Sequence, residues 1–141
     1  MKKILLVFIA LLISTASFTQ NNKITIAVTG IKAHKGGVVK TGLYKKDGFP
    51  LKGQETFGKN VEVSAAPIKV IFDSIPDGTY AIAVFQDCNK DEKLNTNLFG
   101  VPVEPYGFSK NKYGTFSPPD FDDVSFDLKN GAVLSLTINL K

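Results

Sequence analysis

Apolar and polar residues alternate with a period of two along much of the chain, the pattern of half-buried β-strands. The alternation is clearest in KITIAVT, residues 23–29, and in TYAIAVF, residues 79–85. The predicted strands are 23–29, 38–44, 61–64, 68–72, 79–85, 124–128 and 132–140. No segment keeps an apolar period of 3.6 residues long enough to predict a helix. About seven short strands predict an all-β fold, an antiparallel β-sandwich.

Two turn sequences refine this prediction. Lys129-Asn130-Gly131 separates the last two predicted strands, and Asn-Gly strongly favours a hairpin between them. Pro76-Asp77-Gly78-Thr79-Tyr80 leads into the strand at 79–85, with proline fixing the turn and glycine supplying a positive φ. This entry resembles the one found in transthyretin-like sandwiches, whose architecture is related to that of immunoglobulin-like domains. The motif favours that type of sandwich and indicates no function.

The segment 87–123 does not have the pattern of a strand. Long irregular segments in compact domains are usually functional or disordered. This one is rich in aromatic residues, which disordered segments lack, so we expect an ordered, packed loop at one end of the sandwich. Loops held by a rigid scaffold are the usual place for recognition. The candidate ligand-binding residues are Asn97, Tyr106, Phe108 and Tyr113.

The N-terminus has the three-part layout of a secretory signal peptide. Lys2 and Lys3 precede an apolar run from Ile4 to Ile13, and small or polar residues follow it. The run is too short to cross a bilayer as a helix. We therefore predict a signal peptide over 1–20, a single domain over 21–141, and a periplasmic or secreted product without a transmembrane segment. No cysteine follows the run as a site for lipid attachment.

Charge and cysteine content narrow the function further. The net charge is +4, but the chain contains lysine and no arginine, the residue that grips phosphate and stacks on bases. This argues against sequence-specific binding to nucleic acid. Cys88 is the only cysteine, so no disulfide forms within the chain. Its neighbours in the sequence do not favour a reactive thiol, and a small buried apolar residue is the simpler interpretation.

The stretch FQDCNKDEKLNTNLFG, residues 85–100, places short oxygen-bearing side chains on alternate positions. Calcium takes six to eight oxygen ligands, and alternate residues of a tight loop supply them. The predicted ligands are Asp87, Asn89, Asp91, the backbone carbonyl of Lys93, Asn95 and, from further along the chain, Glu104. Glu92 and Leu98 stand where an EF-hand needs glycine and glutamate, so the loop is not an EF-hand. The alternative is a metal-free loop closed by Asx-turns.

The run from Gly78 to Leu128 contains, in order, the motifs G-T-Y-A, D-C-N-K-D, E-P-Y-G-F-S and P-P-D-F. With these motifs it resembles domain-of-unknown-function family 2141, a bacterial family of exported proteins. The resemblance implies an exported β-sandwich and no established activity. Three positions depart from the family pattern: Gln86 replaces histidine, Asn95 replaces aspartate and Pro105 replaces glycine. The matching residues are Gly78, Tyr80, Ala81, Asp87, Asn89, Asp91, Leu94, Asn97, Gly100, Pro102, Glu104, Tyr106, Gly107, Phe108, Ser109, Pro118, Pro119, Phe121 and Asp123.

Two functions follow from these patterns. The first is a non-catalytic binding or structural module of the cell envelope, with an unidentified envelope ligand or protein as partner and a calcium-stabilised loop. The alternative is a glycosidase-like hydrolase, which needs two carboxylates across a cleft. The acids available in the loop are Asp87, Asp91, Glu104, Asp120, Asp122 and Asp123.

Overall fold

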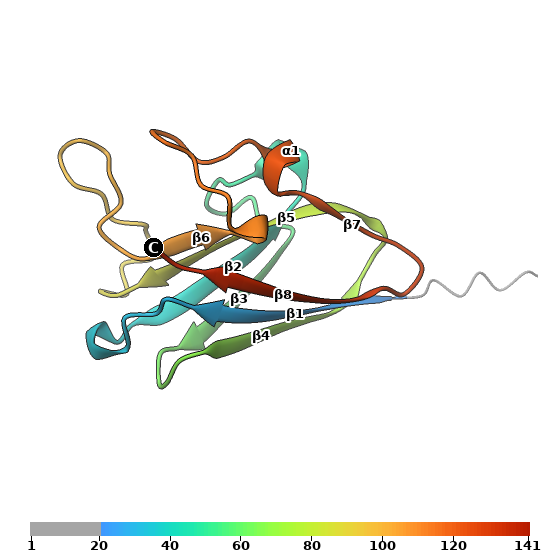
Figure 1. The fold of residues 1–141 in the computed structure, drawn as a ribbon, viewed down its shortest axis with the longest axis horizontal. Helices are drawn as coiled ribbons and strands as arrows, with labels where there is room; N and C mark the ends of the chain where they lie inside the picture. The colour runs from blue at the N-terminus through green and yellow to red at the C-terminus, as the bar shows by residue number, and fades with distance from the viewer. Residues whose placement is uncertain (1–20) are drawn as a thin grey trace, which may run out of the picture.

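The computed structural model describes residues 21–141, which form two facing β-sheets (Figure 1). The smaller sheet has the strand order β4 (Ile68–Ile75), β1 (Asn22–Thr29), β8 (Val133–Asn139). The larger sheet has the order β3 (Phe57–Glu62), β2 (Val38–Tyr44), β5 (Gly78–Asp87), β6 (Tyr106–Phe108), and β7 (Phe126–Leu128) also pairs with β5. The all-β prediction is confirmed, with eight strands in the described residues. The predicted signal peptide, 1–20, lies outside them.

The predicted hairpin between the last two strands is wrong. β7 pairs with β5 in the larger sheet, whereas β8 pairs with β1 in the smaller one. Asn130 and Gly131 do take the positive φ values typical of such a turn, 58° and 70°. Their connection carries the chain from one sheet to the other instead. Asp77 helps to hold it there, because its carboxylate accepts the backbone N–H of Asn130 and the side-chain amide of Asn22.

The sandwich is also not purely antiparallel. β8 runs parallel to β1, with Ile24 opposite Leu134 and Val28 opposite Ile138. Every other strand pair is antiparallel. β1 is the central strand of its sheet, so one of its edges forms hydrogen bonds with β4 and the other with β8. The described residues contain no helix long and apolar enough to cross a membrane.

The main core lies between the sheets and comes from the alternation seen in the sequence. β1 contributes Ile24, Ile26 and Val28, and β5 contributes Tyr80, Ile82 and Val84, all buried. The other core positions are Val39, Leu43, Ile68, Val70, Phe72, Ile75, Leu128, Ile138 and Leu140. The eight strands of the described residues and this core lie within 22–140.

The sequence predicted an irregular loop over the whole segment 87–123, but the structure shows regular elements within it. It contains β6, the short 3₁₀ helix η3 (Ser109–Asn111) and most of the one-turn helix α1 (Phe121–Val124). Other 3₁₀ turns are η1 (Ala33–Lys35) and η2 (Lys46–Gly48). Ser109 fixes η3, since its buried hydroxyl donates to the Val124 carbonyl and accepts the Ile82 N–H.

A second apolar cluster covers the outer face of the larger sheet. Its buried members are Ala81, Phe108 and Val124, and partly buried rings pack around them. Phe49 lies at its centre, with ring centroids 5.8 Å from those of Tyr44, Phe108 and Phe121 in edge-to-face geometry. Such pairs add to the stability that burial provides. The later part of the long segment is therefore anchored on the sheet, beside the candidate site.

Candidate functional site

A groove of about 550 Å³ lies on the outer face of the larger sheet, next to the second apolar cluster. Strands β2, β3, β5 and β6 form its floor, and the loops after β2 and β5 form its sides. Its lining residues are Lys40, Thr41, Gly42, Tyr44, Pro50, Lys52, Gly53, Glu55, Gly58, Asn60, Ala83, Val84, Phe85, Glu92, Lys93, Leu94, Tyr106, Phe108 and Pro118. Its volume is within the range of small-ligand sites.

Small residues lie in the middle of the strands that form the floor of the groove. Gly42 on β2 lies directly opposite Gly58 on β3 and Ala83 on β5. Gly42 has no room for a larger side chain, because a Cβ atom there would lie 2.5 Å from the Tyr44 ring. A glycine inside a strand commonly marks such a close approach. The Tyr44 ring thus lies over the space that Gly42 leaves.

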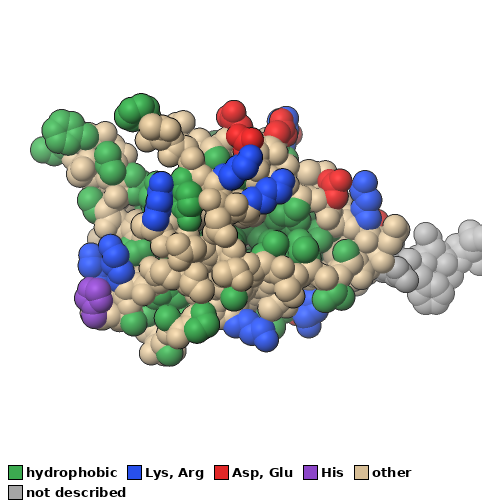
Figure 2. Space-filling model, viewed as in Figure 1, with side chains coloured by type: hydrophobic (Ala, Val, Ile, Leu, Met, Phe, Trp, Pro, Cys, Tyr) green, Lys and Arg blue, Asp and Glu red, His purple; other side chains and the backbone are tan. Residues whose placement is uncertain are grey.

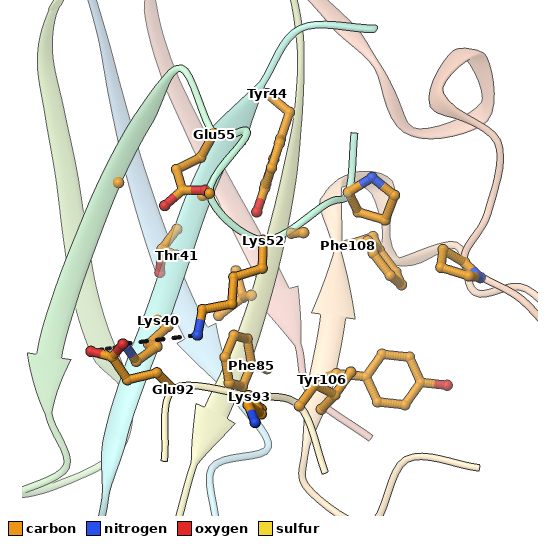
Figure 3. A pocket seen from close by; sticks show the side chains of 18 of the residues that line it. Lys40, Thr41, Tyr44, Lys52, Glu55, Phe85, Glu92, Lys93, Tyr106 and Phe108 are labelled. Carbon is orange, nitrogen blue, oxygen red and sulfur yellow. Dashed lines mark ion pairs between the residues drawn. The ribbon is translucent and has the colours of Figure 1, made fainter. Parts of the chain in front are cut away.

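Aromatic and charged side chains meet in the groove. Figure 3 shows Phe85, Lys52 and the hydroxyl end of Tyr44 directed into it, while the Tyr106 hydroxyl points away. Glu92 closes one side with two ion pairs, its carboxylate oxygens lying 3.6 Å from Lys40 Nζ and 3.8 Å from Lys52 Nζ. An apolar surface with a few fixed polar groups is the usual composition of a ligand pocket.

Tyr44 stays protonated in this environment. Burial, and then the charge of Glu55, raises the pKa of Tyr44 to about 12. Both causes disfavour a phenolate. Tyr44 therefore presents a neutral hydroxyl to the groove, which can donate a hydrogen bond to a ligand as well as accept one.

The carboxylate of Asp87 organises the loop that follows β5. Asp87 is fully buried, and it accepts the backbone N–H groups of Asp91 at 3.1 Å and Glu92 at 2.9 Å. Glu92 has a φ of 66°, in the left-handed region that residues other than glycine rarely adopt. These two hydrogen bonds fix the backbone of the loop and with it the direction in which the Glu92 side chain projects.

Glu104 closes the same loop from the other side. Its Oε1 accepts the Cys88 N–H at 2.8 Å and its Oε2 accepts the Asn95 N–H at 3.0 Å. Cys88 is half-buried, and burial raises the pKa of its thiol, followed by the charge of Glu104. The thiol therefore remains protonated at neutral pH, where it is a poor nucleophile.

The remaining predicted metal ligands gather around Asp91. Asn89 Nδ2 and Asn95 Nδ2 each lie 3.0 Å from Asp91 Oδ2, and the Lys93 N–H donates to Asp91 Oδ1 at 2.9 Å. The Asn89 side chain also accepts the N–H of Asp91, which is an Asx-turn. Within residues 21–141, no three His, Cys, Asp or Glu side chains are close enough together to hold a metal ion.

The four predicted ligand-binding residues lie in different places. Tyr106 and Phe108 line the groove. Tyr113 packs against Tyr106 with centroids 6.1 Å apart, and Lys141 Nζ lies 4.2 Å from the Tyr113 centroid. Asn97 lies at the far end of the loop, where its side chain accepts the N–H groups of Phe99 and Val101. The prediction that this aromatic-rich segment is packed is wrong for two of its rings, since Phe99 and Phe116 are exposed.

The acids considered for hydrolysis do not gather in the groove. Its carboxylates are Glu55 and Glu92, which sequence reasoning did not select. Asp122 instead pairs with Lys46 at 2.7 Å, and Asp123 pairs with Lys112 at 3.3 Å. Asp120 and Asp123 border a smaller hollow at the 112–120 loop.

Comparison with known proteins places the chain in a family. The sequence profile of the bacterial family DUF2141, described as an uncharacterised protein conserved in bacteria, matches residues 26–135. The chain belongs to the DUF2141 family. The match runs from the middle of β1 to the first residues of β8 and includes the whole groove, so this DUF2141 protein has its candidate site inside the family region. No curated protein and no solved structure matches the chain significantly.

One position where this DUF2141 chain departs from the expected pattern has a structural role. Gln86 is fully buried, and its amide donates to the carbonyls of Lys32 at 3.0 Å and Gly36 at 2.7 Å. Its Oε1 accepts the Lys32 N–H at 2.8 Å. Gln86 thus ties η1 to the end of β5, on the inner side of the sheet. It supplies no group to the groove.

Proposed function

We propose that this protein is a non-catalytic binding module that holds a small sugar-like ligand in the groove of the larger sheet. The observation that carries the proposal is the groove itself. A cavity of about 550 Å³ combines the rings of Tyr44, Phe85 and Phe108 with a rim of lysines, glutamates and Asn60. A sugar ring has one apolar face and several hydroxyl groups, so it matches both parts of this lining.

The position of the polar groups supports a neutral or weakly acidic ligand. Lys40 and Lys52 both face Glu92, so the charge in this part of the groove is partly balanced. Ligand hydroxyls that bond to these side chains would add to an existing polar network. Burial of an apolar ring face against Phe85 would supply the rest of the affinity, since apolar contact is the main source of binding free energy.

The sequence of residues 1–20 supports an exported protein, so we place this module in the periplasm or outside the cell. Polysaccharides of the envelope would be accessible in either place. This part of the proposal is tested by N-terminal sequencing of the protein recovered from cells. An intact Met1 on cytoplasmic protein would contradict it.

Nuclear magnetic resonance titration tests the binding proposal. Soluble trisaccharides of glucose and of N-acetylglucosamine are added separately to the uniformly ¹⁵N-labelled protein. At least one should shift the amide signals of Gly42, Gly58 and Asn60, which line the groove from β2 and β3. Phe85→Ala should weaken that binding about tenfold or more, since it removes one buried ring contact. Shifts confined to other faces would contradict the site.

A matched variant separates the groove from general charge effects. Lys52→Ala removes a rim lysine, and Lys129→Ala removes an equally exposed lysine outside the groove lining. Only Lys52→Ala should weaken the sugar complex. Equal losses in both variants would point to non-specific attraction rather than to the groove.

We also propose that calcium binds at Asp91, the centre of the Asp and Asn cluster. The supporting observation is Asn95 Oδ1, a buried oxygen without a hydrogen-bond partner. The amides of Asn89 and Asn95 already contact the Asp91 carboxylate through nitrogen. Rotation of either amide would direct an oxygen to the same place, and oxygen is the ligand that calcium requires. The thermal test is argued in the Discussion.

A further inference from the structure

The groove of the larger sheet holds two charged side chains of opposite sign that have no partner. Its charged lining residues are Lys40, Lys52, Glu55, Glu92 and Lys93. Three of them form the network in which Glu92 pairs with Lys40 and Lys52. Among the described residues, Glu55 and Lys93 form no ion pair, either with each other or with another side chain. One negative and one positive charge are thus left open to a ligand.

The charges around the groove do not neutralise these two. Figure 2 shows acidic side chains next to lysines on the visible face of the molecule, and Asp122 with Lys46 is one such pair. The acids next to Glu92 in the chain, Asp87 and Asp91, do not line the groove. Their carboxylates accept hydrogen bonds within their own loop. The balance of charge in the groove is therefore set by its own lining.

Glu55 lies beside the hydroxyl group of Tyr44. A Cβ atom on Gly58 would lie 3.7 Å from Glu55 Oε1, and one on Gly42 would lie 2.8 Å from Tyr44 Oη. Gly42 and Gly58 are directly opposite each other in the ladder between β2 and β3, so both Cβ positions are on the same face of the sheet. The carboxylate and the hydroxyl are therefore neighbours on the floor of the groove, as Figure 3 also shows.

The Tyr44 hydroxyl is a polar group with no bond of its own. Tyr44 is 7% exposed, and its hydroxyl end is directed into the groove. The hydroxyls of Tyr80 and Tyr113 bond to backbone carbonyls, whereas that of Tyr44 has no hydrogen-bond partner among the described residues. A carboxylate and a hydroxyl oxygen side by side match a group with positive charge and several N–H donors. An ammonium group has both properties.

Lys93 lies at the other end of the groove. Figure 3 shows Lys93 and Glu92 at one end, and Glu55 with the Tyr44 hydroxyl at the opposite end. With Lys40 and Lys52, the Lys93 end holds three lysines and one glutamate, an excess of two positive charges. The ligand group that suits this end is a carboxylate, which forms charge-assisted hydrogen bonds with lysine.

We propose that the groove selects a zwitterionic sugar, one that carries both a free amine and a carboxylate. The amine binds between Glu55 and the Tyr44 hydroxyl, and the carboxylate contacts Lys93. The inference rests on the proposed function, since it names the class of sugar that the groove takes. Such a ligand is neutral overall, which suits a groove whose charges nearly balance.

Four related monosaccharides separate the two ligand charges. N-acetylglucosamine carries neither charge, glucosamine carries the amine, N-acetylmuramic acid carries the carboxylate, and muramic acid carries both. Each is titrated into the ¹⁵N-labelled protein at about pH 6, where an amine is protonated. The amide signals of Gly42 and Gly58 report binding in the groove. Muramic acid should bind most tightly, and each charge should tighten binding about threefold to fivefold, the effect of a partly exposed ion pair.

Three variants assign each gain to its residue. Glu55→Gln should remove the gain due to the amine and keep that due to the carboxylate, and Lys93→Gln should do the reverse. Glu62→Gln changes an exposed acid of β3 outside the groove lining and should alter neither gain. An effect of Glu62→Gln equal to that of Glu55→Gln would mean that the amine responds to the overall charge of the protein, which overturns the proposal.

The proposal is also overturned if muramic acid binds no more tightly than N-acetylglucosamine, in the case where both bind and in the case where neither does. The same holds if Glu55→Gln leaves the preference for the amine unchanged. Binding of a neutral trisaccharide in the groove would then leave the proposed function standing without this inference. If neither the trisaccharides nor the four monosaccharides shift the groove signals, both proposals are wrong.

Discussion

The carboxylate of Asp87 accepts the backbone N–H of Glu92, with 2.9 Å between Oδ2 and N. Asp87 is buried beside the groove and does not line it, whereas Glu92 lies in the groove and pairs with Lys40 and Lys52. A residue outside the site therefore fixes a residue within it. The loop predicted as a calcium site is also the part of the chain that shapes one side of the groove.

Replacing Asp87 should destabilise the protein. Asp87→Ala leaves the N–H of Glu92 without its acceptor and the N–H of Asp91 with Asn89 Oδ1 alone. An unpaired polar group that is not fully solvated costs about 1–3 kcal/mol. Urea unfolding of the variant measures the loss. Glu92→Ala is the control, since its exposed ion pairs should contribute only about 0–1 kcal/mol. Equal stability of Asp87→Ala and wild type would show that the two bonds contribute nothing.

The strands of the sandwich could be predicted because burial alternates along them. Ile24, Ile26 and Val28 point into the core from one strand, as their spacing indicates. The pairing of the strands could not be predicted in the same way. Asn130-Gly131 has the local geometry of a hairpin turn, yet β8 finds its partner in β1, more than a hundred residues earlier. Local turn chemistry does not determine which edge a strand will meet.

The candidate site was predicted only in part, for a related reason. Tyr106 and Phe108 were selected because they lie in an aromatic-rich segment. Lys40 and Gly42 were treated as ordinary strand positions. They become part of a groove only because β3 and β5 pair on either side of β2. The signal available in the sequence was the glycine inside a strand. Its meaning depends on Tyr44, whose ring lies over it.

The stability of the protein should fall at alkaline pH through Tyr44. The folded pKa is raised to about 12 from the usual value near 10, so the unfolded chain loses this proton first. The stabilising contribution is complete below about pH 10 and is lost as the pH rises towards about 12. Ultraviolet absorbance of the phenolate, taken as wild type minus Tyr44→Phe, isolates this titration. A difference spectrum that titrates near pH 10 would contradict it.

The floor of the groove should tolerate a methyl group at Gly58 but not at Gly42. A Cβ atom at Gly42 would lie 2.5 Å from the Tyr44 ring, whereas at Gly58 its nearest neighbour is Glu55 Cγ at 3.4 Å. We expect Gly42→Ala to lower the stability by about 1–3 kcal/mol through overpacking. Gly58→Ala should be within about 1 kcal/mol of wild type or slightly more stable. Urea unfolding compares the pair, and equal losses would mean that Tyr44 moves freely.

Calcium should raise the melting temperature of the wild-type protein if it binds at Asp91. A ligand that binds the folded state alone stabilises it by mass action. About 1 mM calcium is a suitable concentration, because extracellular calcium sites commonly have affinities in that range. Differential scanning calorimetry with calcium and then with a chelator measures the shift. Magnesium at the same concentration should produce a smaller one, because it demands stricter geometry and retains its water.

Asp91→Ala is the variant that distinguishes calcium binding from loop structure. Its carboxylate is exposed, so the folded state should survive its loss, whereas Asp87→Ala would change stability with or without the metal. The calcium shift should disappear in Asp91→Ala and persist in Asp73→Asn, which changes another exposed acid, on β4. If calcium does not change the melting temperature of the wild-type protein, the calcium proposal is wrong and these residues form a metal-free loop closed by Asx-turns. The hydrogen bonds of Asn89 and Lys93 to Asp91 would then be structural alone.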